Sequence, residues 1–159
     1  MTKQRTAWAW TTATFFATGF LRPGPGTWGS AAGLGIWLAV AHWAHPTRGH
    51  LAVGTAIAAL VLLVIGIRAS AIVAQESGTD DPSFVVVDEV VGQWIALIGA
   101  VIAPWSWLLA LLLFRAFDIV KPPPARQFDR MHGGFGIMMD DVAAGVYALV
   151  LTWLATRYF

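Results

Sequence analysis

A block of polar side chains between Phe114 and Gly145 is the stretch of this sequence best equipped for chemistry. Its flanks are almost purely apolar, and its ionisable members are Arg115, Asp118, Lys121, Arg126, Asp129, Arg130, His132, Asp140 and Asp141. By insertion scales, a charge at the centre of a membrane span costs about 2.5 to 3.5 kcal/mol, so the charges that an apolar chain retains tend to be functional. We therefore expect this block to form the reactive face of a small membrane protein.

Two acidic pairs share the same sequence context. Asp88-Glu89 precedes an apolar run with Gly92 soon after it, and Asp140-Asp141 precedes another with Gly145. Helix capping is the structural alternative, but a cap needs one carboxylate, and adjacent carboxylates repel each other unless a cation lies between them. Because Mg²⁺ prefers hard oxygen ligands, we interpret Asp88, Glu89, Asp140 and Asp141 as metal ligands. The glycines would let their helices pack closely enough to bring the pairs together.

Basic side chains follow the apolar run that ends at Phe114. If a short helix starts after the prolines at 122–124, Arg126 and Arg130 share one face of it. Together with Lys121 they would bind a substrate phosphate, since Arg offers a planar fork and Lys a point charge. Anchoring to anionic lipid headgroups explains the same spacing equally well.

Two further acids lie in this segment. Asp118 either pairs with Arg115 or Lys121 or completes a metal site, and spacing alone does not choose between these roles. Asp129 either forms an ion pair with a neighbouring arginine or belongs to the reactive group.

Two glycine-containing stretches are weaker candidates. In residues 23–30, Thr27 is predicted to be the N-cap of the helix that follows, and a helix start near glycines also suits an anion. Residues 132–136 are predicted to form a glycine-rich turn whose backbone N–H groups could approach an anion. Thr27 is therefore a candidate phosphate contact, and His132 is either structural or a general acid.

Composition places the chain in the membrane class. Of its 159 residues 57% are hydrophobic, and its mean hydropathy is +0.65, which indicates one domain, residues 1–159, more apolar than an ordinary soluble one. Ten basic and nine acidic residues give a net charge of +1, which argues against a nucleic-acid binder. The absence of cysteine excludes a disulfide, a thiolate metal site and a phosphatase with a cysteine nucleophile.

The apolar runs predict an all-α, multi-pass membrane bundle of short helices. Spans are expected at residues 28–44 and 51–67, and residues 142–156 are expected to form the last apolar helix, which is short for a full span. Residues 1–21 are expected to form an interfacial amphipathic helix, with a first full span as the alternative. The aromatic side chains expected at its lipid boundary are Trp8, Trp10, Phe15 and Phe16.

The remaining apolar run, residues 90–114, contains Pro104. One kinked span would put the membrane between Asp88-Glu89 and the later acids, whereas two short helices that turn at Pro104 would leave all of them on one side. We favour this hairpin. It places all nine carboxylates on one side, together with Lys3, Arg5, Arg22, Arg68, Arg115, Lys121, Arg126 and Arg130, and leaves Arg48 and Arg157 on the other. The positive-inside rule then makes the polar side cytoplasmic.

Five sequence blocks, taken in order, resemble the phosphatidylglycerophosphatase A family. They are residues 25–30, 87–94, 114–122, 129–130 and 133–145. Taken together, the five blocks are highly specific for this family. The resemblance extends from about Gly19 to Gly145 and so covers most of the chain. The sequence departs from the family's usual residues at Arg22 and Gly24, just ahead of the Pro-Gly-Thr turn.

This resemblance implies an all-helical, Mg²⁺-dependent lipid phosphatase of the bacterial inner membrane that converts phosphatidylglycerophosphate into phosphatidylglycerol, with its active site facing the cytoplasm. The acidic positions that it carries over are Asp88, Glu89, Asp118, Asp129, Asp140 and Asp141, and its phosphate contacts are Thr27, Lys121, Arg126 and Arg130. Catalytic roles are expected for Glu89, Asp141, Asp118 and Asp129. The expected partners are the phospholipid substrate and the membrane, and the oligomeric state is left open.

The expected attacker is a metal-activated water, with Glu89 or Asp141 as the base and a phospho-aspartate as the alternative route. A small transporter or ion-binding membrane protein is the alternative from another functional class. A third alternative is a structural protein that binds lipid through its arginines alone. An enzyme gathers its acids at one interface, whereas a transporter needs access from both sides.

Overall fold

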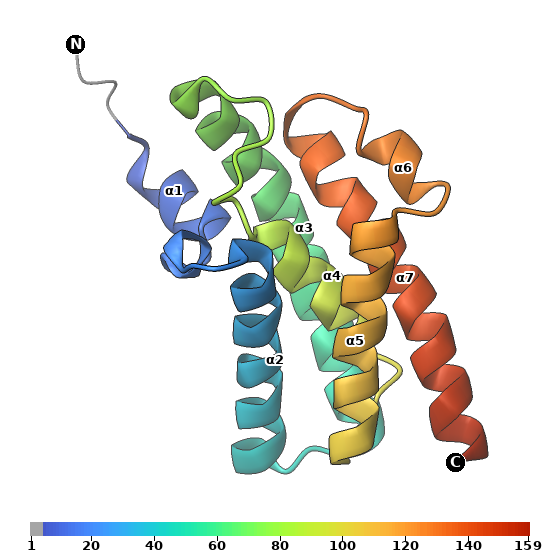
Figure 1. The fold of residues 1–159 in the computed structure, drawn as a ribbon. Helices are drawn as coiled ribbons and strands as arrows, with labels where there is room; N and C mark the ends of the chain where they lie inside the picture. The colour runs from blue at the N-terminus through green and yellow to red at the C-terminus, as the bar shows by residue number, and fades with distance from the viewer. Residues whose placement is uncertain (1–4) are drawn as a thin grey trace.

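The computed structural model describes residues 5–159, and within this range the chain is helical and contains no strand. Four long helices run alongside one another, and the shorter elements lie between them or at one end (Figure 1). The elements are α1 Ala7–Ala13, the 3-10 helix η1 Thr18–Phe20, α2 Pro25–Ala44, α3 Arg48–Ser77, α4 Val87–Leu97, α5 Pro104–Val120, α6 Ala125–Phe128 and α7 Gly133–Tyr158. This architecture confirms the predicted all-α bundle.

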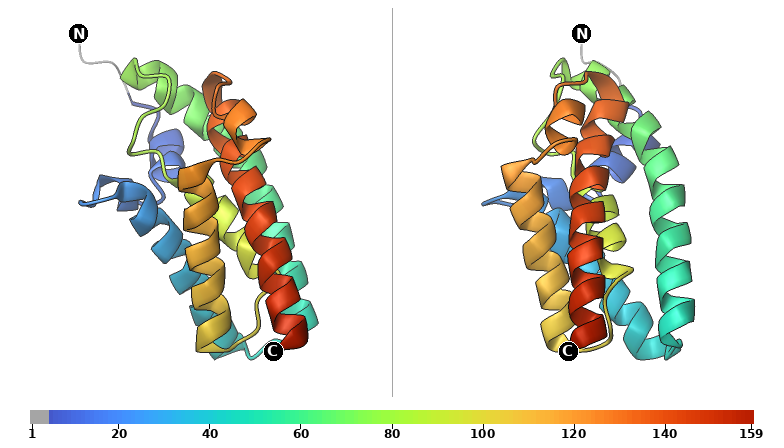
Figure 2. Two further views of the ribbon diagram at one scale, coloured as in Figure 1. Left: turned by 45° about the vertical axis from the view of Figure 1, so that its right-hand side comes forward. Right: turned by 90° about the vertical axis from the view of Figure 1, so that its right-hand side faces the viewer.

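The short helix α4 is the centre of the bundle. It packs against α2, α3, α5 and α7, and two further views show it enclosed by these longer helices (Figure 2). Its apolar side chains Val87, Val90, Val91 and Leu97 are almost completely buried, and burial of such side chains stabilises each by about 1.5 to 3 kcal/mol. The packing therefore holds the polar first turn of α4 in a fixed place.

The connection between α4 and α5 is a turn, so residues 90–114 are not one kinked span. Helix α4 ends at Leu97, and α5 begins with Pro104 at its first position, where the missing N–H of proline costs nothing. The Ser106 side chain accepts a hydrogen bond from the Val101 amide at 2.9 Å and fixes the turn. The predicted hairpin is confirmed, and it returns the end of α5 to the same end of the bundle as the start of α4.

At the opposite end of the bundle, hydrogen bonds join α3, α7 and the turn between α4 and α5. The Arg48 side chain at the start of α3 donates to the Thr156 hydroxyl near the end of α7, at 3.0 Å. The Thr156 hydroxyl in turn donates to the Gly99 carbonyl in the α4–α5 turn, also at 3.0 Å. Arg48 and Arg157 thus lie at the end away from the acids, as the charge pattern predicts.

The predicted end of one helix and the predicted start of another are wrong. Helix α3 continues to Ser77 instead of ending near Ile67, and α7 begins at Gly133, nine residues before the start expected at 142. The predicted glycine-rich turn is therefore the first turn of α7. Glycines are tolerated there because Gly134 and Gly136 lie in close contact with other backbone, that of α3 and of Met131 respectively.

The N-terminal segment also differs from the expected interfacial helix. Helix α1 ends at Ala13, because Phe15, Phe16 and Ala17 have positive φ angles of 42°, 55° and 71°. Trp8 and Phe16 are exposed, but Phe15 is buried in the core. Trp10 points inward, donating to the Glu76 carboxylate at 2.7 Å. Of the expected helix at residues 1–21, residues 1–4, including Lys3, lie outside the described part.

Two helices of the described chain, α3 and α7, are long and apolar enough to cross a membrane. Helix α2, which covers the span expected at 28–44, is not among them. The side chains of Val53, Ile57, Leu60 and Val64 on α3 are 58–61% exposed. A core helix of a soluble protein would bury such side chains, so α3 supports a membrane-associated protein.

Candidate active site

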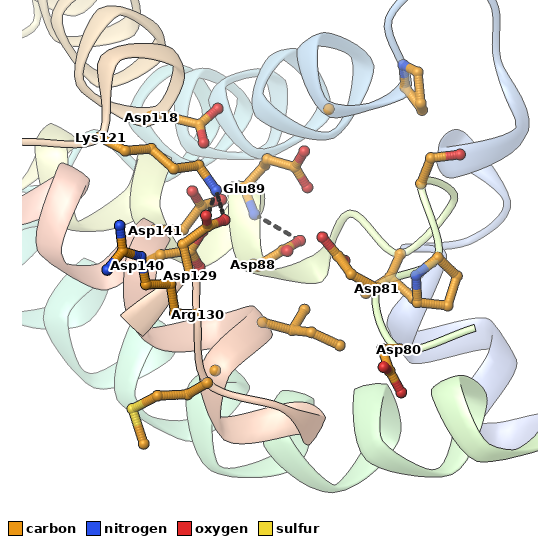
Figure 3. A pocket seen from close by; sticks show the side chains of 18 of the residues that line it. Asp80, Asp81, Asp88, Glu89, Asp118, Lys121, Asp129, Arg130, Asp140 and Asp141 are labelled. Carbon is orange, nitrogen blue, oxygen red and sulfur yellow. Dashed lines mark hydrogen bonds and ion pairs between the residues drawn. The ribbon is translucent and has the colours of Figure 1, made fainter. Parts of the chain in front are cut away.

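A cavity of about 400 Å³ opens at the end of the bundle where the acids gather. Its walls come from the first turns of α2 and α4, the end of α5, the start of α7 and the two loops at residues 78–86 and 121–132 (Figure 3). Segments far apart in the sequence thus contribute to one polar chamber. The apolar helices determine its position, because each of them brings its polar end to the same place.

Three carboxylates converge in this cavity. One oxygen each from Asp88, Glu89 and Asp141 lie within 4.8 Å of one another. Helix α4 places Asp88 and Glu89 in its first turn, and α7 places Asp141 in its third turn. Helix capping therefore does not explain Asp141, because the start of α7 is two turns away.

The environment of the three carboxylates fits a divalent cation. Burial raises the pKa of Asp88 well above its usual range, and the negative charge of Glu89 raises it further. Burial likewise raises the pKa of Glu89. One oxygen of Glu89, Oε2, is buried and has no hydrogen-bond partner in the described chain. A hard cation such as Mg²⁺ would favour the ionised forms of the Asp88 and Glu89 carboxylates, and it could take Glu89 Oε2 as a ligand.

The close approach of α4 and α7 depends on two glycines. A Cβ atom at Gly92 would lie 2.7 Å from the Asp141 carbonyl oxygen and would also overlap the Phe114 ring. A Cβ atom at Gly145 would lie 2.6 Å from the Gly92 carbonyl oxygen. The prediction that these glycines let the helices pack closely is confirmed, and it explains how Asp141 reaches Asp88 and Glu89.

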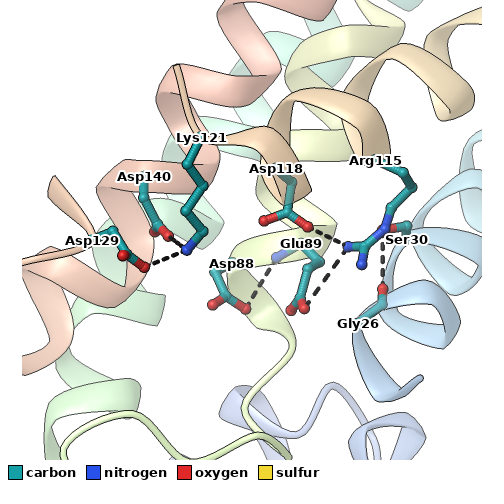
Figure 4. A network of polar contacts seen from close by, with 9 residues as sticks. All are labelled: Gly26, Ser30, Asp88, Glu89, Arg115, Asp118, Lys121, Asp129 and Asp140. Carbon is teal, nitrogen blue, oxygen red and sulfur yellow. Dashed lines mark hydrogen bonds and ion pairs between the residues drawn. The ribbon is translucent and has the colours of Figure 1, made fainter. Parts of the chain in front are cut away.

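Asp140 lies apart from these three carboxylates. Its Oδ2 atom forms an ion pair with Lys121 Nζ at 2.6 Å, and Lys121 also pairs with Asp129 (Figure 4). Asp140 faces Lys121 because it precedes Asp141 on α7, and neighbouring residues of a helix point in directions about 100° apart. The structure thus supports Asp140 as a partner of Lys121 in place of the expected metal ligand.

Lys121 is held as a cation at the cavity wall. Burial lowers its pKa, but the hydrogen bonds to Asp129 and Asp140 outweigh this, so its pKa is raised overall. It ends α5 in a left-handed conformation with φ of 49°, directly before three prolines that cannot continue the helix. Its position is therefore fixed by both backbone and side-chain contacts.

Arg115 connects two of the acids. Its Nη1 atom lies 2.7 Å from Asp118 Oδ2, one helical turn away, and 3.9 Å from Glu89 Oε1 (Figure 4). Of the roles left open for Asp118, pairing with Arg115 is the one observed. No catalytic role was predicted for Arg115, although its spacing of three from Asp118 is a usual signal of a helical ion pair.

Two of the four predicted phosphate contacts line the cavity, and the other two do not. Arg130 and Lys121 line it, whereas Thr27 and Arg126 are exposed and lie outside the lining. The predicted N-cap at Thr27 is wrong, because α2 begins at Pro25 with Gly24 as its N-cap.

The backbone that precedes Thr27 reaches the cavity instead. Gly24, Pro25 and Gly26 form part of its wall. A Cβ atom at Gly26 would collide with Glu89 Oε1, so this glycine leaves room for that carboxylate.

Two further acids lie at the cavity and were not assigned from the sequence: Asp80 and Asp81, from the loop after α3. His132 also lines the cavity, is exposed and lies 3.9 Å from Asp80. No short-range pattern distinguishes these loop acids from ordinary turn residues. His132 is the N-cap residue of α7, which agrees with the structural role considered for it.

The fold and this cavity define a membrane-associated helical protein with a chamber of carboxylates and cations at one end. A family model described as phosphatidylglycerophosphatase A matches residues 11–156. The chain belongs to the phosphatidylglycerophosphatase A family, a family of phosphatases, which confirms the resemblance seen in its sequence blocks.

Relatives from three bacteria cover most of the chain. A Haemophilus influenzae protein named phosphatidylglycerophosphatase A is 38% identical over 91% of this chain and 85% of its own. An Escherichia coli protein of the same name is 35% identical over 82% of this chain and 73% of its own. A Bacteroides thetaiotaomicron protein named "Putative phosphatidylinositol-3-phosphatase" is 40% identical over 89% of both chains. No solved structure matches the chain significantly.

Replacing Lys121 by Met is expected to lower phosphate release about a hundredfold, because the cavity loses a cation and Asp140 is left buried without its partner. Lys121→Arg keeps the charge and should retain a larger share of the activity. Both variants are measured by initial rates of phosphate release from purified protein in detergent. Equal rates for Lys121→Met and the unaltered protein would contradict a role for this cation.

Proposed function

We propose that this protein is a divalent-cation-dependent phosphatase that removes the terminal phosphate of phosphatidylglycerophosphate and leaves phosphatidylglycerol. The observation that carries the proposal is the convergence of three carboxylate oxygens within 4.8 Å in a cavity that Lys121 and Arg130 also line. The names of the Haemophilus and Escherichia relatives support the choice of substrate.

Asp88, Glu89 and Asp141 would hold the cation, for which Mg²⁺ is the expected ion. When bound, such a cation supplies Lewis-acid stabilisation of the phosphoryl oxygens. Lys121 and Arg130, which line the same cavity, bind the same phosphate and neutralise the charge that develops on it during transfer. Arg115, held by Asp118, keeps Glu89 in position.

The reaction is a hydrolysis. A water oxygen forms a bond to phosphorus while the bond from phosphorus to the glycerol oxygen breaks, and the glycerol oxygen leaves with a proton. Glu89 is a candidate to accept the proton of the water through a carboxylate oxygen that does not bind the cation, because it belongs to the group of three carboxylates. Asp141 is the alternative base, because it lies in the same group.

The position of the acids favours an enzyme over a transporter. The acids come from the end of α3, the start of α4, the end of α5, the start of α7 and the loops that join these ends. A transporter would need polar groups along a path that is open to both sides. We propose a multi-pass arrangement in the inner membrane with the cavity on the cytoplasmic side, because Arg68, Lys121, Arg126 and Arg130 lie toward that end of the bundle.

The experiment is phosphate release from phosphatidylglycerophosphate in detergent micelles, measured first with Mg²⁺, then after a chelator, and again after Mg²⁺ is restored. Phosphatidylinositol 3-phosphate is assayed in parallel, because the Bacteroides relative carries the name of that activity. We expect release from phosphatidylglycerophosphate that stops with the chelator and returns with Mg²⁺. Release from phosphatidylinositol 3-phosphate alone would overturn the proposed substrate, and release from neither lipid would overturn the proposed function.

A further inference from the structure

A second cavity, of about 250 Å³, lies between α2 and α3 in the half of the bundle away from the acids. Helices α2 and α3 both pack on α4 but have little contact with each other. The cavity is a groove between these two helices, and α4 contributes Trp94 to its lining. Its lining residues are Ile36, Trp37, Val40, Pro46, His50, Leu51, Gly54, Thr55, Ala58 and Trp94.

The groove surface is apolar although it contains several polar residue types. The Trp94 indole Nε1 donates to the Gly33 carbonyl at 2.9 Å, so this donor is already satisfied. The Thr55 hydroxyl donates to the Leu51 carbonyl within its own helix at 2.7 Å. Ile36 and Val40 at the edge are 43% and 47% exposed. Trp37 Nε1 is buried without a hydrogen-bond partner in the described chain. The rest of the lining is largely apolar, and such a surface suits a hydrocarbon chain, which offers no hydrogen bonds in return.

The groove and the acidic cavity share two helices. On α4, Trp94 follows Glu89 by five residues, about 8 Å along the axis. On α2, Ile36 follows Gly26 of the acidic cavity by ten residues, about 15 Å along the axis. A molecule with an anionic head and a long apolar tail could therefore place the head among the charges and the tail end in the groove.

We infer that the groove between α2 and α3 binds one long acyl chain of the phospholipid substrate while the phosphate lies in the acidic cavity. This inference deepens the proposed function and depends on it for the identity of the substrate. The occupant is the chain of the same lipid, because α2 and α4 each contribute residues to both the acidic cavity and the groove. Chain length should then contribute to the specificity of the enzyme.

Gly54 offers a direct test. It lines the groove, and a Cβ atom there would have no other atom within 4 Å. Gly54→Leu therefore extends a side chain into the groove without a clash, and it improves helix propensity. Gly35 on α2 is also exposed, also has open space at its Cβ position and lies outside the groove lining. Gly35→Leu is thus the matched control.

The measurement is kcat/KM for two forms of phosphatidylglycerophosphate, one with two palmitoyl chains and one with two hexanoyl chains. We expect Gly54→Leu to lower kcat/KM for the long-chain form about tenfold, which corresponds to displacing about two methylene groups. The short-chain form should be cleaved at the rate of the unaltered protein, and Gly35→Leu should change neither. An unchanged long-chain rate in Gly54→Leu, or an equal loss for both substrates, would overturn the inference.

A binding experiment separates this inference from the proposed function. Phosphatidylglycerol with a photoreactive group at the end of one acyl chain should label residues 36–40 or 50–58, and label them less in Gly54→Leu than in Gly35→Leu. This readout is independent of whether phosphate is released. Labelling elsewhere, or equal labelling by phosphatidylcholine with the same chain, which would mark a bilayer lipid only, would overturn the inference.

Discussion

Replacing Glu89 by Gln or Asp141 by Asn is expected to lower phosphate release at least about a thousandfold while the protein stays folded. Each change removes a charged oxygen from the three carboxylates that lie within 4.8 Å of one another. The amide side chains are nearly isosteric, and loss of a negative charge from a repelling group should not destabilise the fold. The measurement is the initial rate of phosphate release in detergent, with circular dichroism to establish that the helices are intact.

Asp80→Asn is the matched control for the carboxylate variants. Asp80 lines the cavity but lies outside the group of three carboxylates. Its side chain is 86% exposed, and its Oδ2 atom lies 3.9 Å from His132 Nε2. The same chemical change there is expected to leave the rate within about a factor of two, since exposed charge pairs contribute little. If Asp141→Asn behaved like Asp80→Asn, the three carboxylates would not be the reactive group.

Replacing Gly92 by Ala is expected to destabilise the protein by about 1 to 3 kcal/mol, because the added Cβ atom overlaps neighbouring atoms in a filled core. One of these atoms is the Asp141 carbonyl oxygen, 2.7 Å away, which is backbone and cannot rotate aside. Helices α4 and α7 must therefore separate, and Asp141 moves away from Asp88 and Glu89. A misplacement of about 1 Å can cost about a hundredfold in rate, so activity should fall with stability.

The Gly92 prediction is checked by thermal unfolding in detergent and by phosphate release from the same preparation. Gly35→Ala is the control, because that helical glycine has open space around its Cβ position. Its expected result is an unchanged or slightly raised midpoint of unfolding, since alanine favours a helix more than glycine does. A Gly92→Ala protein as stable and as active as the unaltered one would contradict the close approach of α4 and α7.

The features of the fold that depend on apolar runs and prolines could be predicted from the sequence. Pro104 ends one apolar run and begins another, so the α4–α5 hairpin follows from local backbone chemistry. The start of α7 could not be predicted in the same way. Gly133, Gly134 and Gly136 favour a turn in isolation. Gly133 opens α7 with a positive φ of 81° and has open space at its Cβ position, whereas Gly134 and Gly136 are helical at close contacts with other backbone, which need residues without side chains.

The sequence predicted which residue types form the candidate site, but not which side chains contact one another within it. The paired acids and the nearby glycines correctly indicated that Asp88, Glu89 and Asp141 would come together. The separation of Asp140 from that group depends on the direction in which each residue of α7 points, and this follows only from where the helix begins. The loop acids Asp80 and Asp81 reach the cavity through the path of the chain after α3, for which the sequence carries no local signal.

The proposed function requires carboxylates from α4 and α7 to hold a divalent cation together. The decisive experiment titrates Mn²⁺ into the purified protein in detergent and follows the free ion by electron paramagnetic resonance. We expect tight binding in the unaltered protein and in Asp80→Asn, and loss of that binding in both Glu89→Gln and Asp141→Asn. Mn²⁺ binding by Asp141→Asn with unaltered affinity would contradict the account.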